Sequence, residues 1–419
     1  MTSRRPVEAL TGLRFIAAFA VAFSHGISHV WPWVGATPEW YSLLNSGAGV
    51  GMPLFFVLSG FVIQYNYSER IREGGSRALF NFFVARFARL YPLYFLCIAY
   101  DVMNSVSYEQ PKPYTLEVLP YFLTMTQSWF YIVFGNNALI YSLGIIPSIA
   151  WSVSTEWFFY VAYPVICFLL AAMKSERARS LAAAAVVVAG FGAAWFVIAN
   201  LARIDAHATT IFGPVASMKT GFQDSFFRWA LYFSPYSRIF EFALGCAAAS
   251  IYMNRRGAAN QNVGKILTIA AIVWTLFWYY IVFGLGVHNY AWINSFNMLH
   301  MSFGLAPGIG LLIYCCARYD NWIVRLLSTP WLILCGEASY SLYLLHGLVV
   351  EMFTPSAAPA RTFLSGAGDA MRLGVCMAAC VGLSLVTWRC IEVPARNAIR
   401  KLLTIKKPAL LPDAEPAAP

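Results

Sequence analysis

The chain has 419 residues, of which 59% are hydrophobic and only 11% are charged, and its formal net charge is +10. Soluble domains are about 45–50% apolar and about 25% charged, so this composition excludes a soluble globular protein and indicates an integral membrane protein. The basic excess does not indicate a nucleic-acid partner, because the Lys and Arg residues cluster in short segments between apolar runs, as positive-inside topology requires.

Ten apolar runs are candidate membrane spans, since a helix needs about 20 apolar residues to cross a bilayer. They cover residues 10–31, 49–67, 90–103, 149–172, 181–200, 239–253, 266–287, 298–317, 331–352 and 371–391. An eleventh run, residues 115–133, is interrupted by Pro120, Gln127 and Ser128. If that run does not cross, twenty basic residues lie on one side of the membrane and five on the other. This asymmetry predicts an all-α bundle of ten transmembrane helices with both termini cytoplasmic, in which 115–133 is a re-entrant or interfacial helix.

The first span carries two ionisable residues, Arg14 and His25, inside its apolar run. They are eleven residues apart, about three helical turns, and therefore lie on one face of the helix. Ionisable groups at membrane depth usually face the bundle interior or a wet cavity. A neutral imidazole suits general-base chemistry near pH 7, so His25 is the candidate catalytic residue, with a packing role as the alternative. Arg14, a second candidate for the catalytic site, is an anion contact, a charge that holds the cytoplasmic mouth of a cavity, or part of the cytoplasmic basic belt. No metal site is expected, because His29 completes no metal-binding pattern.

The second and third predicted spans contain two informative patterns. Gly47 and Gly51 are four residues apart, a spacing typical of close helix packing, and Ser59 either lines a cavity or packs. Arg86 and Arg89 are three residues apart, on one helical face at the cytoplasmic end of the third span. Paired guanidinium groups suit phosphate recognition, although positive-inside topology alone also accounts for them.

Carboxylates in two later spans need partners, because an unpaired charge in an apolar run is costly. Glu156, at the start of the 149–172 run, is a candidate to orient His25 or a substrate hydroxyl, or to bridge to an arginine. Arg238 and Glu241 are three residues apart, which predicts an ion pair on one helix, and both are also candidates to line a substrate cavity.

The ninth predicted span concentrates polar side chains, which favours a lined cavity over plain packing. Its polar residues are Glu337, Ser339, Tyr340, Ser341, Tyr343 and His346. No large soluble segment interrupts the apolar runs, so residues 1–396 are predicted to form a single transmembrane domain. Residues 397–419 are predicted to be a short basic and then Pro- and Ala-rich cytoplasmic tail.

Seven motifs occur in order between about residue 10 and residue 396, and each alone is loose. They are GLRFIAAFAVAFSH, FFVLSGFVI, ARFARLYPLY, WSVSTEWFFYVAYP, RIFEFALG, EASYSLYLLHG and IEVPAR. Together they resemble the acyltransferase 3 family of bacterial integral-membrane O-acyltransferases. The family's Arg–ten residues–His signature maps onto Arg14 and His25, and its paired arginines map onto Arg86 and Arg89. Glu156 is followed by a tryptophan where many relatives have two acidic residues in sequence.

This resemblance implies a multi-pass enzyme of the bacterial inner membrane, without the extracytoplasmic hydrolase-like domain that some members append. It implies acyl-CoA, most often acetyl-CoA, as cosubstrate and no tightly bound cofactor. The acceptor would be a hydroxyl on a sugar of a cell-surface polysaccharide, lipopolysaccharide or related glycoconjugate, with His25 as general base. Two other classes stay open: a transporter or flippase of a glycan or lipid-linked intermediate, and a non-catalytic partner of a polysaccharide synthase. Intramembrane charge fits transport, but no inverted repeat is visible.

Overall fold

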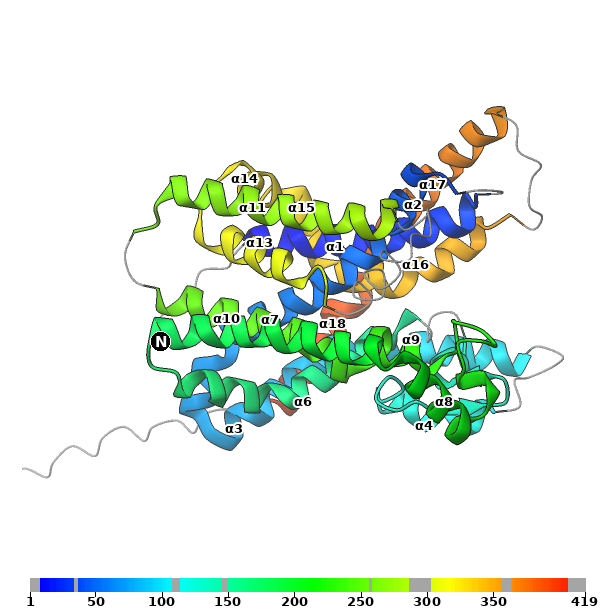
Figure 1. Cartoon of the computed structure of the whole chain (residues 1–419), viewed down its shortest axis with the longest axis horizontal. Helices are drawn as coiled ribbons and strands as arrows, with labels where there is room; N and C mark the ends of the chain where they lie inside the picture. The colour runs from blue at the N-terminus through cyan, green and yellow to red at the C-terminus, as the bar shows by residue number, and fades with distance from the viewer. Residues whose placement is uncertain are drawn as a thin grey trace, which may run out of the picture.

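The computed structural model describes residues 8–33, 37–107, 114–144, 149–255, 258–285, 303–355 and 363–405, and over these ranges it is almost wholly helical (Figure 1). Its longer helices are α1 (Glu8–Val30), α3 (Gly47–Ser107), α6 (Trp151–Ala172), α7 (Glu176–Ala199), α10 (Pro235–Asn254), α11 (Gln261–Tyr279), α13 (Ala306–Arg318), α16 (Ser339–Phe353) and α17 (Phe363–Thr387). Its shorter α-helices are α2 (Glu39–Asn45), α4 (Thr115–Leu123), α8 (Leu201–Phe212), α9 (Phe226–Arg228), α14 (Trp322–Leu327), α15 (Pro330–Glu337) and α18 (Val393–Leu403). Strands β1 (Val133–Phe134) and β2 (Asn137–Ala138) pair antiparallel.

Within the described ranges, six helices are long and apolar enough to cross a membrane, or seven if the bent pair α15–α16 is one span. The chain is therefore a multi-pass membrane protein, and its helical class is as predicted. The second and third predicted spans lie in α3, whose helical path is interrupted at Gly75, where φ is 57°. Positive φ strains residues that carry a Cβ, so glycine suits this reversal. The predicted spans 266–287 and 298–317 extend into residues 286–302, and the predicted tail into residues 406–419, which lie outside the described residues.

Two predicted elements differ from the structure. The run 115–133 is helical only as far as Leu123, because the following segment turns inward to satisfy buried polar groups. There the Gln127 amide donates to the Ala150 carbonyl over 3.4 Å, and the Ser128 hydroxyl donates to Ser154 over 2.8 Å. The predicted span 331–352 is two helices, α15 and α16, bent by 69°. The basic beginning of the predicted tail is helical, as part of α18.

Helix α1 lies in the middle of the bundle, packed against α3, α15, α16 and α17, while α10 packs on α3, α6 and α7 (Figure 1). The predicted close packing of Gly47 and Gly51 is confirmed. A Cβ on Gly47 would lie 2.5 Å from the carbonyl oxygen of Ala20 in α1, and a Cβ on Gly51 would lie 2.7 Å from that of Ala17. This backbone contact holds α1 and α3 together, and these two helices supply most of the charged residues of the site.

Helices α4, α8 and α9 gather at one end of the bundle (Figure 1). The Asp224 carboxylate, just before α9, accepts a hydrogen bond of 2.8 Å from the backbone N–H of Ala138 in β2. The Tyr131 hydroxyl donates to the Asp224 carbonyl over 2.6 Å. These contacts tie the hairpin to α9 and hold the loop residues that line the larger cavity described below.

Candidate functional site

Two neighbouring cavities in the described part of the bundle contain the candidate site residues, and Met52 and Tyr343 belong to the walls of both. The arginine cavity, of about 60 Å³, takes its lining mainly from α1, α3, α6 and α16 and contains Arg14. The histidine cavity, of about 730 Å³, contains His25. Since both cavities share Met52 and Tyr343, these two side chains form the partition between them. Arg14 and His25 share one helix, as predicted, but face different compartments.

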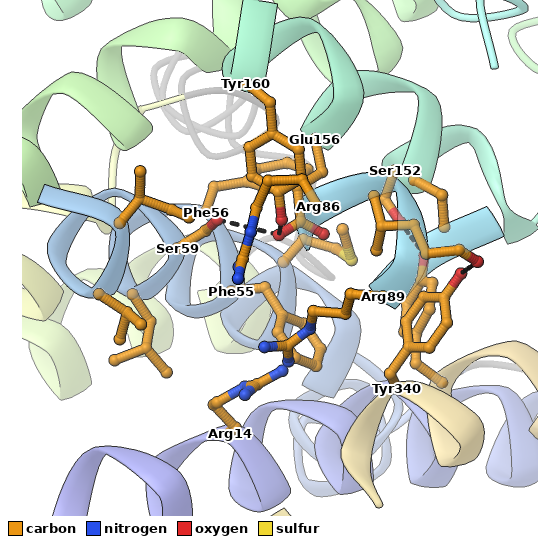
Figure 2. A pocket seen from close by; sticks show the side chains of 17 residues that line it. Arg14, Phe55, Phe56, Ser59, Arg86, Arg89, Ser152, Glu156, Tyr160 and Tyr340 are labelled. Atoms are coloured by element: carbon orange, nitrogen blue, oxygen red, sulfur yellow. Dashed lines mark hydrogen bonds between the residues drawn. The ribbon is translucent and has the colours of Figure 1, made fainter. Parts of the chain in front are cut away.

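Three guanidinium groups, those of Arg14, Arg86 and Arg89, converge in the arginine cavity (Figure 2). Arg86 donates to the Tyr67 hydroxyl over 2.7 Å, yet its buried Nε has no hydrogen-bond partner. Among the described residues, neither Arg14 nor Arg89 is ion-paired or hydrogen-bonded through its side chain. A buried donor such as Arg86 Nε is normally satisfied, so the cluster of half-buried guanidinium groups has few acceptors among the described residues.

Glu156 is the carboxylate that lines the arginine cavity (Figure 2). Its Oε1 accepts a hydrogen bond of 2.9 Å from Ser59 and another from the Tyr160 hydroxyl. The carboxylate attracts both Arg86 and Arg89 electrostatically without an ion-pair contact. One carboxylate faces three guanidinium groups, so the cavity keeps an excess of positive charge.

His25 reaches the histidine cavity from α1, and its inner nitrogen is held by a second histidine. His25 Nδ1 lies 2.7 Å from Nε2 of His346, which is on α16 and fully buried. His346 Nδ1 lies 2.6 Å from the carbonyl oxygen of Tyr343 in its own helix. His346 lines neither cavity, so it stands behind His25 as seen from the histidine cavity.

Aromatic and hydrogen-bonding groups surround the rest of the histidine cavity. Trp151 and Tyr232 line it with their rings 5.1 Å apart, and the guanidinium of Arg228 lies 5.9 Å from the ring of Tyr141. Burial raises the pKa of Tyr141 to about 12, so its hydroxyl stays protonated and able to donate at neutral pH. Glu351 also lines the cavity. Flat rings mixed with donors and acceptors match the chemistry of a sugar, which has apolar ring faces and many hydroxyls.

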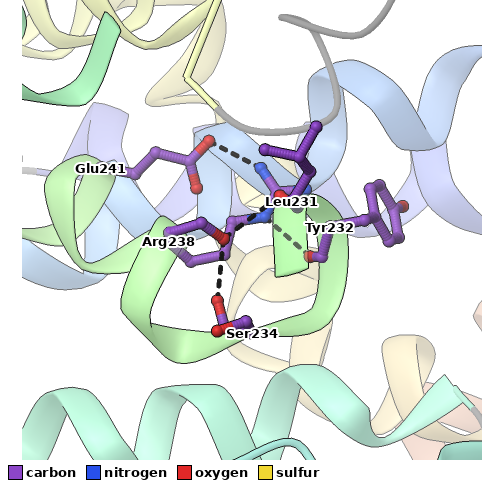
Figure 3. Close-up of polar contacts among 6 residues, drawn as sticks. Leu231, Tyr232, Ser234, Arg238 and Glu241 are labelled. Atoms are coloured by element: carbon purple, nitrogen blue, oxygen red, sulfur yellow. Dashed lines mark hydrogen bonds and ion pairs between the residues drawn. The ribbon is translucent and has the colours of Figure 1, made fainter. Parts of the chain in front are cut away.

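The structure brings six of the predicted site residues together in the arginine cavity: Arg14, Ser59, Arg86, Arg89, Glu156 and Tyr340. Glu156 therefore does not orient His25, because it lies on the other side of the partition. The predicted ion pair of Arg238 and Glu241 is confirmed, with Nη1 and Oε1 2.8 Å apart and both side chains buried (Figure 3). That pair lines neither cavity and has a structural role. Ser341 also lines neither, since its hydroxyl donates to Glu392 over 3.0 Å.

Some residues that line the two cavities were not predicted from the sequence. Tyr160 was detectable, because it lies four residues after Glu156 and so on the same helical face. Met52, Trp151, Arg228 and Tyr232 carry no comparable local signal. They come from separate elements and meet only through the tertiary packing around the histidine cavity.

Comparisons with known proteins cover nearly all of this chain. A family model described as an acyltransferase domain matches residues 7–389. The chain is 24% identical over 362 residues to the peptidoglycan O-acetyltransferase OatA of Listeria monocytogenes, covering 84% of this chain and 51% of that protein. It is 25% identical over 357 residues to the putative peptidoglycan O-acetyltransferase YrhL of Bacillus subtilis, covering 84% and 50%.

A third relative, the acyltransferase MdmB of Streptomyces mycarofaciens, is 25% identical over 427 residues, covering 97% of this chain and 95% of that protein. The chain thus spans about half the length of the first two relatives and nearly all of the third. No solved structure matches it.

Proposed function

The chain belongs to the acyltransferase 3 family of acyltransferase domains, and on that premise we propose that it is a membrane O-acyltransferase. The reaction moves an acyl group, acetyl by preference, from acyl-CoA to a hydroxyl of a cell-surface glycan. The arginine cavity, separated from His25 by Met52 and Tyr343, is the observation that carries this proposal, because its three guanidinium groups suit phosphate recognition and lie close to a candidate base. The similarity to OatA, a peptidoglycan O-acetyltransferase, and to YrhL, a putative one, favours a peptidoglycan-like polysaccharide as the acceptor.

In this proposal the arginine cavity holds the phosphates of acyl-CoA. Guanidinium groups bind phosphate through a planar fork of donors, and Arg14, Arg86 and Arg89 offer three such forks. Glu156 limits their mutual repulsion and, through Ser59, fixes the wall opposite them. The pantetheine arm then extends past the partition and brings the thioester to His25.

The histidine cavity holds the acceptor glycan. His25 takes the proton of the acceptor hydroxyl, and the oxygen attacks the thioester carbonyl directly. The tetrahedral intermediate collapses by breaking the carbon–sulfur bond, and the His25 imidazolium returns its proton to the CoA thiolate. Acylated glycan and CoA leave with His25 neutral again, so proton and electron counts balance.

The proposed topology gives each cavity its own side. With ten spans and both termini cytoplasmic, α1 runs outward from the cytoplasm. Arg14 then lies nearer the cytoplasm and His25 nearer the outside. Acyl-CoA is made in the cytoplasm and surface glycans are outside the inner membrane of bacteria, so a protein in that membrane meets both substrates.

The test measures free CoA and acylated glycan with the purified protein in lipid nanodiscs, using acetyl-CoA and peptidoglycan fragments. We expect acetyl-dependent CoA release that His25→Ala reduces at least 10²-fold, the range of general-base contributions. His207→Ala is the matched control, because His207 is an exposed histidine on α8 that lines neither cavity.

Mass analysis of the envelope glycans from a deletion strain extends the test to acceptors beyond peptidoglycan. Loss of an acyl mass on deletion, restored by the wild type and not by His25→Ala, supports the proposal. A glycan that loses its surface location but keeps its acyl groups, with CoA thioesters left intact, indicates transport and overturns it.

A further inference from the structure

We infer that His346 is a positioning residue that fixes the tautomer of His25, so that the lone pair of His25 Nε2 faces the histidine cavity. The contacts of the two imidazoles with each other and with one backbone carbonyl carry this inference. It rests on the proposed function only in the consequence for catalysis. The tautomer itself is a property of the protein without substrates.

The assignment starts at the Tyr343 carbonyl, which can only accept a hydrogen bond. His346 Nδ1, 2.6 Å away, must therefore carry a hydrogen and donate it. In neutral His346 the other nitrogen, Nε2, then holds a lone pair. Nδ1 of His25 lies 2.7 Å from that lone pair and must be the donor. A neutral His25 protonated at Nδ1 has its own lone pair at Nε2, as a general base requires.

The ring geometry agrees with this chain of two hydrogen bonds. The ring centroids of His25 and His346 are 5.0 Å apart, whereas the two bonded nitrogens are 2.7 Å apart. The difference is about twice the distance from a ring centroid to its own nitrogen, so both nitrogens lie on the line that joins the centroids. The ring planes differ by 21°. The two imidazoles thus meet edge to edge and nearly in one plane, where both the N–H bond and the lone pair lie.

Of the titratable groups considered around His25, His346 is the one placed to orient its imidazole. Glu156, the carboxylate that the sequence offered for this role, lies in the arginine cavity. His29, the other titratable group that acts on His25, is one turn further along α1 and exposed. His346 is fully buried on α16, which packs directly on α1, so its ring is held by the core.

The consequence for catalysis follows from which nitrogen is free. An imidazole without the partner prefers the hydrogen on Nε2, which would aim its lone pair at residue 346 and away from the acceptor. Removing the partner therefore lowers kcat by misplacing the lone pair, while substrate contacts and KM stay nearly unchanged. Replacing such supporting partners typically costs about 10–100-fold in metal sites, and we expect a similar factor here.

Two variants separate positioning from packing. His346→Gln keeps an acceptor oxygen near the place of Nε2, whereas His346→Leu fills similar space without an acceptor. We expect His346→Gln to retain kcat within about tenfold and His346→Leu to lose about 10–100-fold, both with the monodispersity and thermal stability of the wild type. Equal kcat in the two variants overturns the inference. If His346→Leu does not fold, the tautomer measurement below on the wild type and His346→Gln decides.

Nitrogen-15 NMR of histidine-labelled protein in detergent reads the tautomer directly. The chain has six histidines, and the signal lost in His25→Ala identifies His25. We expect Nδ1 of His25 to show the shift of a protonated nitrogen and Nε2 that of an unprotonated one, in both the wild type and His346→Gln. The reverse pattern in the wild type overturns the inference. This readout needs no substrate, so failure of acetyl transfer alone would count against the proposed function and leave the tautomer assignment standing.

Discussion

At the scale of single residues, Arg238 and the arginines of the arginine cavity lie in different environments. Arg238 and Glu241 satisfy each other within one helix, and Arg238 Nε also donates to the Tyr232 carbonyl over 2.9 Å. Arg14 and Arg89 have no acceptor among the described residues and face a cavity. A satisfied ion pair has a structural role, whereas half-buried guanidinium groups that face a cavity remain able to donate hydrogen bonds to an anion.

Breaking the Arg238–Glu241 pair tests its structural role. Glu241→Leu leaves a fully buried guanidinium without its counter-charge, which we expect to lower the free energy of unfolding by about 3–5 kcal/mol. The double variant Arg238→Met/Glu241→Leu removes both charges and should recover part of that loss. Denaturant unfolding in detergent measures both. A double variant less stable than Glu241→Leu would contradict the pairing argument.

Neutralising one arginine of the cavity tests anion binding. Arg89→Gln should raise the KM for acyl-CoA about 10–100-fold, because a charge-assisted hydrogen bond contributes about 1.5–3 kcal/mol. The KM for the acceptor should change little. Arg325→Ala is the control, since Arg325 is 75% exposed and pairs with Asp320 at the surface, where ion pairs contribute little. An unchanged donor KM in Arg89→Gln would place the phosphates elsewhere.

At the scale of helices, hydrophobic runs predicted where most elements lie but not how they end. Runs 10–31, 149–172 and 181–200 match α1, α6 and α7 closely, because an apolar run of that length has one stable form in a bilayer. The early end of α4 and the bend between α15 and α16 were not predictable. Both depend on partners distant in sequence, such as the Ala150 carbonyl, just before α6, that bonds Gln127 and the Ser154 hydroxyl that bonds Ser128.

The contact between α3 and α10 gives a prediction with a built-in control. A Cβ at Gly60 would lie 2.0 Å from the Phe242 carbonyl oxygen, so Gly60→Ala must separate the two helices. We expect a loss of about 1–3 kcal/mol in unfolding free energy, the usual cost of overpacking. Gly192→Ala, on α7, meets no atom within 4 Å and should be neutral or slightly stabilising. Thermal unfolding in one detergent compares the two, and equal stability would refute the close contact.

At the scale of the whole molecule, the sequence selected most of the charged residues that line the arginine cavity but left the neighbours of Glu156 open. Spacing on a single helix was enough to pair Arg86 with Arg89. The sequence could not decide whether Glu156 lies near His25, a substrate hydroxyl or an arginine, because its position depends on how α6 packs against α3. The partition between the cavities was invisible as well, since Met52 looks like any apolar residue of a span.

The partition formed by Met52 and Tyr343 allows a test of whether the acyl thioester passes between the two cavities. If the thioester passes from the arginine cavity to His25, it must pass Met52 or Tyr343, and an unbranched methionine side chain can move aside. Met52→Trp should narrow this route. We expect it to lower kcat at least tenfold in a protein that still binds CoA through its three arginines, as measured by calorimetry in nanodiscs. Met52→Leu keeps the volume and should transfer nearly as well as the wild type. If Met52→Trp folds, binds CoA and transfers at the wild-type rate, the acyl group reaches His25 by another route and the two cavities work separately.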